Sequence, residues 1–293
     1  MTKMDNKGFS LVELLIAMVI GLIIVAALTG VYTGSLSVFK DVKSISNTID
    51  TKTPSIELLS RYFERWGKGV ASQQENVSCT TCPAARQTIV ITTANGCSDV
   101  TFFGNLYGFG FVHDVAGGAA NVISCRLSTA SNQNCYILWR DNSPLNTVTS
   151  GALDPVGLSS LTTQNAECLT LTAASNSNAQ INSTVSGIAV QAGDVIQRVP
   201  HAIRLYCASN TNDENRTWLY VDQTDQSAGY CTDDEPARPI APVESFTVQG
   251  LPAGCDAAGG ACNAVQVNVV FRSQSKNFKG QFDQLSVQRV FGR

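Results

Sequence analysis

The sequence predicts an α+β protein, in which a long N-terminal helix packs on a mainly antiparallel β-sheet head stapled by disulfides. No charged residue occurs between Leu14 and Phe39, and a run of that length suits a helix that crosses a bilayer. From Thr88 onward the chain consists of short β-type runs between turn residues, which is typical of antiparallel sheets. All ten cysteines follow residue 78, which places the disulfides in the β-rich part.

Composition indicates an exported protein. The 293-residue chain is only 15% charged, against about 25% in ordinary soluble domains. A net charge of -3 argues against a chain that coats nucleic acid or an anionic membrane. Ten cysteines against two histidines favour disulfides over metal sites, and disulfides persist outside the reducing cytoplasm.

The N-terminal segment predicts how the chain is oriented in the membrane. Residues 1–8 are polar and include Lys3 and Lys7, whereas Phe9 begins an apolar stretch that only Glu13 interrupts. The lysines predict a cytoplasmic N-terminus and an exported remainder. A cleaved secretory signal does not fit, because the apolar run is too long and lacks an Ala-x-Ala site. Glu13 is costly within a membrane, which marks it as a functional residue that needs a partner.

The segment Lys7–Glu13 (KGFSLVE) resembles the prepilin signature of type IV pilins. This resemblance implies that a dedicated peptidase cuts after Gly8 and methylates Phe9, so that residues 1–8 are a cytoplasmic leader. Glu13 is then the carboxylate that sets assembly register, because it and a neighbour's amino terminus neutralise each other in apolar surroundings. Residues 9–39 are expected to form the transmembrane and assembly helix. Many major pilins have proline where this chain has Gly30, so Gly30 is its expected point of flexibility.

Residues 40–69 predict an amphipathic stalk helix that continues into the head. Pro54 predicts a kink or a one-turn break, and Gly67 and Gly69 predict the helix end. One apolar stripe, expected to dock the stalk on its own head, runs through Val42, Ile45, Ile49, Ile56, Leu59, Phe63 and Trp66.

Residues 70–293 predict the β-rich head. The expected strands are 88–93, 100–103, 136–140, 169–171, 201–207, 218–221, 243–248, 265–271 and 285–290. Surface loops are expected at 116–121, 173–186 and 210–215.

Several segments narrow the resemblance within the type IV pilins. They are similar to PilW-type minor pilins, which are related to the J-type pseudopilin of type II secretion: Pro54–Gly69 (PSIELLSRYFERWGKG), Ile203–Tyr206 with Trp218–Tyr220, Val243–Phe246 and Leu285–Arg289. The resemblance implies the pilin fold and a structural, non-enzymatic subunit that primes pilus assembly and sits at the fibre tip. The alternatives are a J-type pseudopilin, and a pilus-borne adhesin or DNA-uptake module.

The ten cysteines predict up to five disulfides. Spacing suggests the local pairs Cys125 with Cys135, Cys207 with Cys231 and Cys255 with Cys262, leaving Cys79, Cys82, Cys97 and Cys168. A redox motif or a zinc site at Cys79-x-x-Cys82 is a weaker interpretation, because a strand follows the motif and no further ligands lie near.

The remaining patterns predict no catalysis and no cofactor. Carboxylates at 213–214, 222–225 and 233–235 suit solvated loops, with calcium as the alternative. The basic stretch Arg272–Arg293 suits a solvated strand face rather than a nucleic-acid contact. No nucleophile elbow, phosphate-binding loop or zinc-protease motif occurs.

The resemblance also implies partners and a location. The expected partners are other minor and major pilins, the prepilin peptidase, the inner-membrane assembly platform, and the membrane itself before assembly. The chain is expected to be a single-pass inner-membrane protein with a periplasmic C-terminus, and to become part of an extracellular pilus afterwards.

Overall fold

The computed structural model describes residues 11–70, 89–106, 109–124, 134–141, 143–146, 148–149, 152–153, 156–157, 160–161, 179–225, 235–255 and 262–292. These residues divide into two compact units. The first unit runs to Asp50 and includes Arg272–Leu285; the second comprises Thr51–Phe271 and Ser286–Arg293. An α+β architecture of one long helix and a mainly β head with disulfides is confirmed.

Helix α1 is a single element, Leu11–Phe63, of 53 residues. It runs through Pro54, so the predicted one-turn break is wrong. Proline removes one backbone hydrogen bond, but burial of Leu59 and Phe63 holds the turns that follow, and local packing outweighs the loss. The helix ends three residues before Trp66, and Gly67 and Gly69 then adopt φ of 72° and 67°, the left-handed conformation that favours glycine after a helix.

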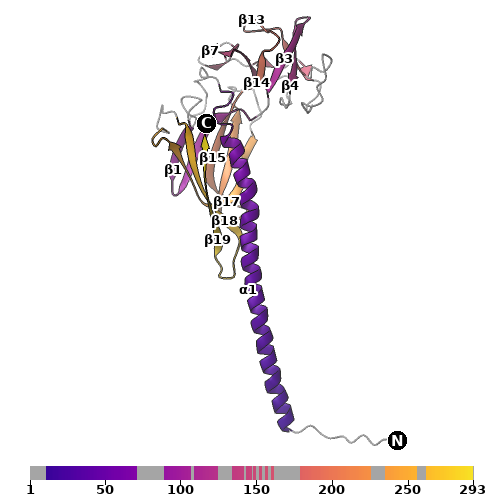
Figure 1. Ribbon diagram of the computed structural model, residues 1–293, viewed down its shortest axis with the longest axis vertical. Coiled ribbons are helices and arrows are strands. Elements are labelled where there is room, and N and C mark those ends of the chain that lie inside the picture. The colour runs from indigo at the N-terminus through magenta and orange to yellow at the C-terminus, as the bar shows by residue number, and fades with distance from the viewer. Residues whose placement is uncertain are drawn as a thin grey trace, which may run out of the picture. The chain divides into compact units, whose positions relative to one another are not determined.

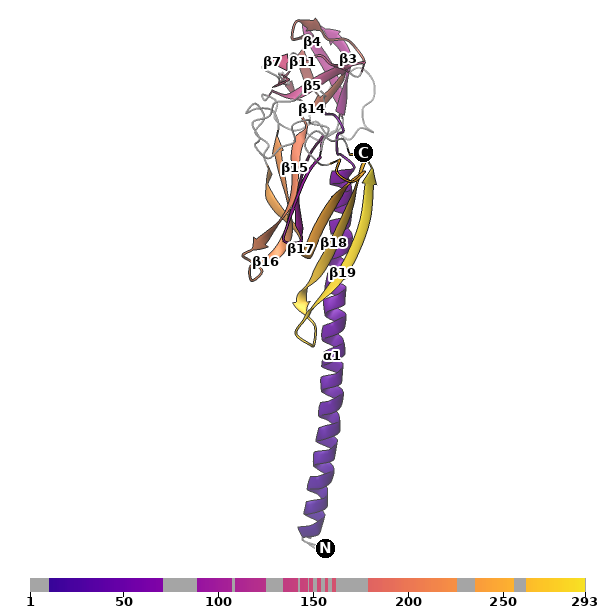
Figure 2. The same cartoon turned by 90° about the vertical axis from the view of Figure 1, so that its left-hand side faces the viewer.

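In the first unit, α1 lies against the end of a hairpin formed by β18 (Ala264–Lys276) and β19 (Phe282–Gly292) (Figure 1 and Figure 2). Ser44 Oγ donates to the Ser275 carbonyl at 3.0 Å, and Asn47 Nδ2 donates to Ser275 Oγ at 3.2 Å. Ser44 and Thr48 are buried here. Small hydroxyl side chains let the hairpin backbone approach the helix and bond to it.

The docking stripe predicted for the stalk is therefore only half right. Val42, Ile45 and Ile49 remain 50–59% exposed. The later members of the stripe, Leu59, Phe63 and Trp66, are buried in the core of the second unit. The apolar pattern predicted one continuous docking face. Instead, the helix makes polar contacts at Ser44 and Asn47 and apolar contacts from Leu59 onward.

The main sheet has seven strands in the order β1-β2-β15-β16-β17-β18-β19, and from β1 to β18 each strand is antiparallel to the next in this order. Its remaining strands are β1 (Ile89–Ala94), β2 (Cys97–Gly104), β15 (His201–Asn210), β16 (Arg216–Asp225) and β17 (Glu235–Leu251). Within the second unit the end of α1 packs on this sheet, and the Phe63 ring stacks on Phe102 and Phe291 with centroids 5.2 and 4.9 Å away. The aromatic stack ties the helix end to the sheet.

A second sheet is inserted in the sequence between β2 and β15. It has eight strands, ordered β10-β11-β4-β3-β14-β5-β6 with β9 beside β5. Its members are β3 (Phe109–Ala116), β4 (Ala119–Ser124), β5 (Asn134–Arg140), β6 (Ser143–Pro144), β9 (Val156–Gly157), β10 (Ser160–Leu161), β11 (Ala179–Asn182) and β14 (Val195–Arg198). Two short ribbons complete the described strands, β7 (Val148–Thr149) with β8 (Ala152–Leu153) and β12 (Thr184–Val185) with β13 (Ile188–Ala189).

This second sheet has its own core and a partly buried ion pair. Arg140 donates from Nε and Nη2 to the two carboxylate oxygens of Asp194, each at 2.7 Å. Desolvation of Asp194 opposes ionisation. The hydrogen bonds from Arg140 and from the Gln191 backbone N–H outweigh it and hold the pKa of Asp194 below its usual range. The pair fixes the start of β14 beside β5.

Two of the predicted loops are strands in part. The segment 116–121 contains the turn between β3 and β4, where Gly117 and Gly118 have φ of 62° and 84°. Positive φ at both central residues gives a two-residue hairpin turn, so the glycines join strands rather than mark a loop. The segment 173–186 includes β11 and β12, whereas 210–215 is the turn that was expected. The expected strand at 169–171 lies outside the described residues.

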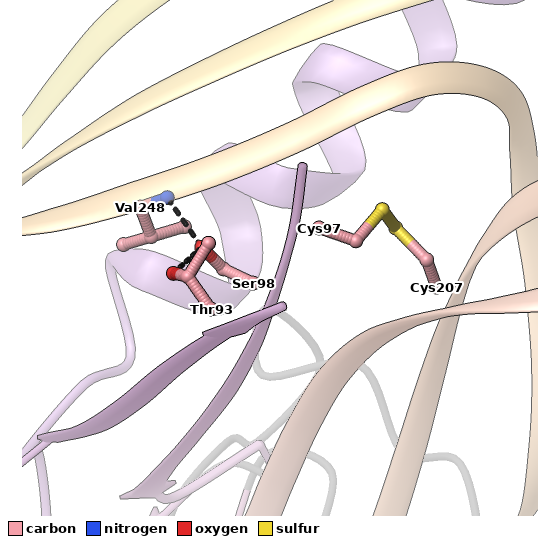
Figure 3. Close-up of a disulfide and its surroundings, with 5 residues drawn as sticks. All are labelled: Thr93, Cys97, Ser98, Cys207 and Val248. Carbon is pink, nitrogen blue, oxygen red and sulfur yellow. Dashed lines mark hydrogen bonds between the residues drawn. A yellow bond between two sulfur atoms is a disulfide. The ribbon is translucent and has the colours of Figure 1, made fainter. Parts of the chain in front are cut away.

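Two disulfides lie among the described residues. Cys255 pairs with Cys262, as the spacing predicted. Cys97 pairs with Cys207, so the predicted Cys207–Cys231 pair is wrong. Beside Cys97, Ser98 Oγ bonds with Thr93 Oγ1 at 2.7 Å and accepts from Val248 N–H at 3.0 Å (Figure 3). Because β2 and β15 are neighbouring strands, Cys97 and Cys207 lie within bridging distance although the sequence separates them by 110 residues.

The end of α1 meets β2 at a point where only glycine fits. A Cβ on Gly104 would lie 2.4 Å from the Arg65 carbonyl oxygen. Around it, Gly67 N–H donates to the Phe103 carbonyl at 2.7 Å, and Asn105 N–H donates to the Lys68 carbonyl at 3.0 Å. This backbone-to-backbone seam joins the helix end to the sheet.

Gly104→Ala is expected to destabilise the protein by about 1–3 kcal/mol, the usual cost of overpacking, because the new methyl group meets backbone. Urea denaturation of the detergent-solubilised chain measures the change. Gly292→Ala is the matched control, since nothing lies within 4 Å of its Cβ position, and it should change stability by less than about 0.5 kcal/mol. Equal stability of the two variants would contradict the proposed close contact.

Replacing Cys97 and Cys207 together with alanine should cost more stability than replacing Cys255 and Cys262 together. The first pair closes a separation of 110 residues and the second a separation of 7. Chain entropy predicts losses of about 4–5 and about 2–3 kcal/mol respectively. Denaturation of the two double variants side by side gives the comparison, and a larger loss for the short loop would contradict the entropic account.

Candidate functional site

The candidate functional site is the N-terminal half of α1. Gly8 and Phe9, the predicted cleavage and methylation residues, lie outside the described residues. Glu13 is in the first described turn of α1 and is exposed. It is the single charged residue between Leu11 and Phe39, so the apolar run carries one carboxylate, close to its start.

The surface of this half of the helix is almost entirely apolar and uncovered. Among the described residues, 26 large hydrophobic side chains are exposed, and 20 of them lie on α1 between Leu11 and Ile49. The helix is long and apolar enough to cross a membrane, and none of its most apolar window is buried within the chain. Water is a poor solvent for such a surface, so it requires lipid or other protein.

Polar groups on this surface are satisfied locally. The hydroxyls of Thr29, Thr33 and Ser37 donate to backbone carbonyls three or four residues earlier, at 2.7–3.1 Å. Side-chain donors that bond within their own helix expose no unmet hydrogen bond to lipid. These residues therefore keep the surface compatible with an apolar environment.

Small residues leave room on the same surface. A Cβ built at Gly21, Gly30 or Gly34 would meet nothing within 4 Å. Beside Gly34, the side chains of Val31, Val38, Phe39 and Val42 surround a shallow apolar hollow. Small residues on an apolar helix allow another helix to approach closely. The helix is unbroken at Gly30.

The other end of α1 is fixed within the second unit by a buried polar contact as well as by its apolar residues. Gln223 Nε2 donates to the Tyr62 hydroxyl at 2.6 Å. Burial raises the pKa of the Tyr62 phenol above its ordinary value, although Arg238 and the Gln223 hydrogen bond oppose this. Tyr62 is therefore a neutral hydrogen-bonding group at physiological pH, and the helix end is a core element of the head.

The other predicted candidates do not assemble into a site among the described residues. Asp213 interacts with Arg216 and accepts from Trp218 Nε1 at 2.8 Å, so its carboxylate holds the β15–β16 turn. No group of three potential metal ligands occurs within the described ranges. Cys79, Cys82, Cys125, Cys168 and Cys231 lie outside those ranges, and of Cys135 only the backbone of β5 is described.

Sequence reasoning missed the polar contact face of the helix. Ser44 and Thr48 are four residues apart and share a helix face, and Thr48 Oγ1 donates to the Ser44 carbonyl at 2.9 Å. The four-residue spacing of these small hydroxyl residues could have indicated the contact face, but a search for apolar stripes does not detect it.

Comparison with known proteins agrees with this geometry. The profile described as the prokaryotic N-terminal methylation motif matches residues 3–29. An uncharacterized protein of Aquifex aeolicus (strain VF5) is 30% identical over 281 residues, which cover 93% of this chain and 95% of that protein. No solved structure matches. The chain therefore belongs to the same family as the Aquifex aeolicus protein and, by its methylation motif, is a type IV pilin-like prepilin.

Proposed function

We propose that the chain is a structural subunit that polymerises through α1 after cleavage at Gly8. The supporting observation is the exposed apolar row Val42, Ile45 and Ile49, which follows the first charged residue after the uncharged run, Lys40. An ordinary membrane anchor has no use for apolar residues beyond the bilayer, because they would face water. Helices of neighbouring subunits in a fibre would cover both this row and the membrane-spanning part.

Glu13 supplies the register in this proposal. In a bundle of apolar helices, sliding one helix along another changes the packing energy little. A carboxylate paired with the methylated amino terminus at Phe9 of a neighbour strongly disfavours every stagger that separates the two charges, since an unpaired buried charge is costly. The peptidase and other pilins are thus the partners that the N-terminal segment requires.

Within the pilin-like proteins, we infer a PilW-type minor subunit that primes assembly at the tip of a type IV pilus. The supporting observation is the second sheet, which has eight strands and is inserted in the sequence between β2 and β15. It makes the head larger than a head built from the seven-stranded sheet and α1 alone. At a fibre tip no further subunit stacks on the head, so extra mass there does not obstruct growth.

Deleting the gene should abolish or sharply reduce surface fibres, counted by electron microscopy, and leave secretion of exported enzymes intact. A priming subunit acts before the first major subunits assemble, so its loss affects fibre number. The opposite result, normal fibres with an exported enzyme retained in the periplasm, would show a J-type pseudopilin of type II secretion instead.

Glu13→Ala should be processed normally, because the cleavage site at Gly8 is intact. It should fail to enter fibres, because it lacks the carboxylate that sets the stagger between neighbouring helices. Immunoblots of membrane and sheared-fibre fractions measure both properties. Gly8→Leu is the matched control, and it should remain uncut and also be absent from fibres. Entry of Glu13→Ala into fibres at the wild-type level would contradict the register role.

A further inference from the structure

The tip of the β18–β19 hairpin is fixed to α1 at the residues where the uncharged run ends. Phe278 N–H donates to Asp41 Oδ1 at 3.0 Å, and Lys40 Nζ lies 5.9 Å from the centroid of the Phe278 ring. One turn further on, Ser44 bonds to the Ser275 carbonyl. All of these residues belong to the first unit. The position of the tip along the helix is thus set by direct contacts.

The tip combines an exposed aromatic ring with positive charge. Phe278 is 52% exposed, and Lys276 and Lys279 on either side of it are exposed as well. Segments 40–47 and 272–283 contain five basic and two acidic residues, a net charge of +3, in a chain whose net charge is -3. Both acidic side chains accept hydrogen bonds, Asp41 from the Phe278 backbone and Asp283 from Asn277 at 3.1 Å. The exposed positive charge of this surface is therefore carried by lysines, including Lys40, Lys276 and Lys279.

The length of the uncharged run places this tip at a membrane surface. The 26 residues from Leu14 to Phe39 extend about 39 Å along a helix axis. A bilayer with its interfacial layers is about 40–45 Å thick. When α1 spans the membrane, Lys40 and the attached Phe278 therefore lie at the headgroup layer on the side of the head.

We propose that the hairpin tip is a membrane-contact element that binds anionic phospholipid headgroups before the subunit is assembled. Phe278 enters the interfacial layer, and Lys40, Lys276 and Lys279 contact lipid phosphates, a combination that suits an anionic membrane surface. A second copy of the chain is a poorer complement, since its helix carries no acidic residue between Leu14 and Phe39. The proposal rests on the membrane-spanning role of α1.

The test uses the full-length chain with Phe278→Trp in vesicles that contain phosphatidylglycerol and phosphatidylcholine with brominated acyl chains. Bromine quenches tryptophan that enters the interfacial layer. Phe109→Trp is the matched control, because Phe109 is also 52% exposed but lies on β3 in the second unit. Quenching is expected to be at least about twofold greater for Phe278→Trp than for the control. Adding Lys276→Glu and Lys279→Glu is expected to reduce it to the control level.

Vesicle flotation separates failure of the tip contact from failure of the membrane-spanning helix. If the variants float with the lipid but Phe278→Trp is quenched no more than Phe109→Trp, the hairpin tip does not contact the membrane, although the helix spans it. If strong quenching survives the double charge reversal, the role of the lysines is wrong. If the chain does not float with vesicles at all, both the membrane-spanning helix and the tip contact are refuted.

Discussion

The fold depends on one constraint: a single helix, α1, must suit an apolar environment outside the chain along its first half and the protein core at its end. Its first half exposes large apolar side chains without cover from the chain, whereas Leu59 and Phe63 in its last turns, and Trp66 just after it, are buried in a β-sheet core. Removing the first half from water requires lipid or other subunits. Burial of its last turns holds the helix end in the head, so any force applied to the helix is transmitted to the sheet through packed side chains.

The sequence contained enough information for the parts of the fold that depend on local pattern. The uncharged run, the turn at 210–215 and the strands near 136–140, 201–207 and 265–271 follow from periodicity and turn residues, and the structure has them. The methylation motif could be recognised for the same reason, since its chemistry needs a short, fixed spacing of Gly8, Phe9 and Glu13.

Two of the errors involve long-range pairing, and a third concerns a local turn. The bridge from Cys97 to Cys207 depends on β15 lying beside β2, and no local spacing encodes that neighbour. The hairpin at Gly117 and Gly118 was missed because alanine and asparagine around the turn have weak strand preference. The contact of Ser44 with Ser275 joins residues that are 231 positions apart, and small polar residues give little sign of being buried until their partner is known.

The ring stack of Phe63 with Phe291 has a consequence for the order of folding. The helix end is synthesised early, but one of its stacking partners follows more than 200 residues later. Contacts between distant segments form slowly because loop closure must precede them. The apolar end of α1 thus lacks this partner until nearly the whole head has been synthesised, and during that interval it is open to proteases and to aggregation. A chaperone that covers the helix end, or rapid pairing of β2 with β15, would shorten this exposure.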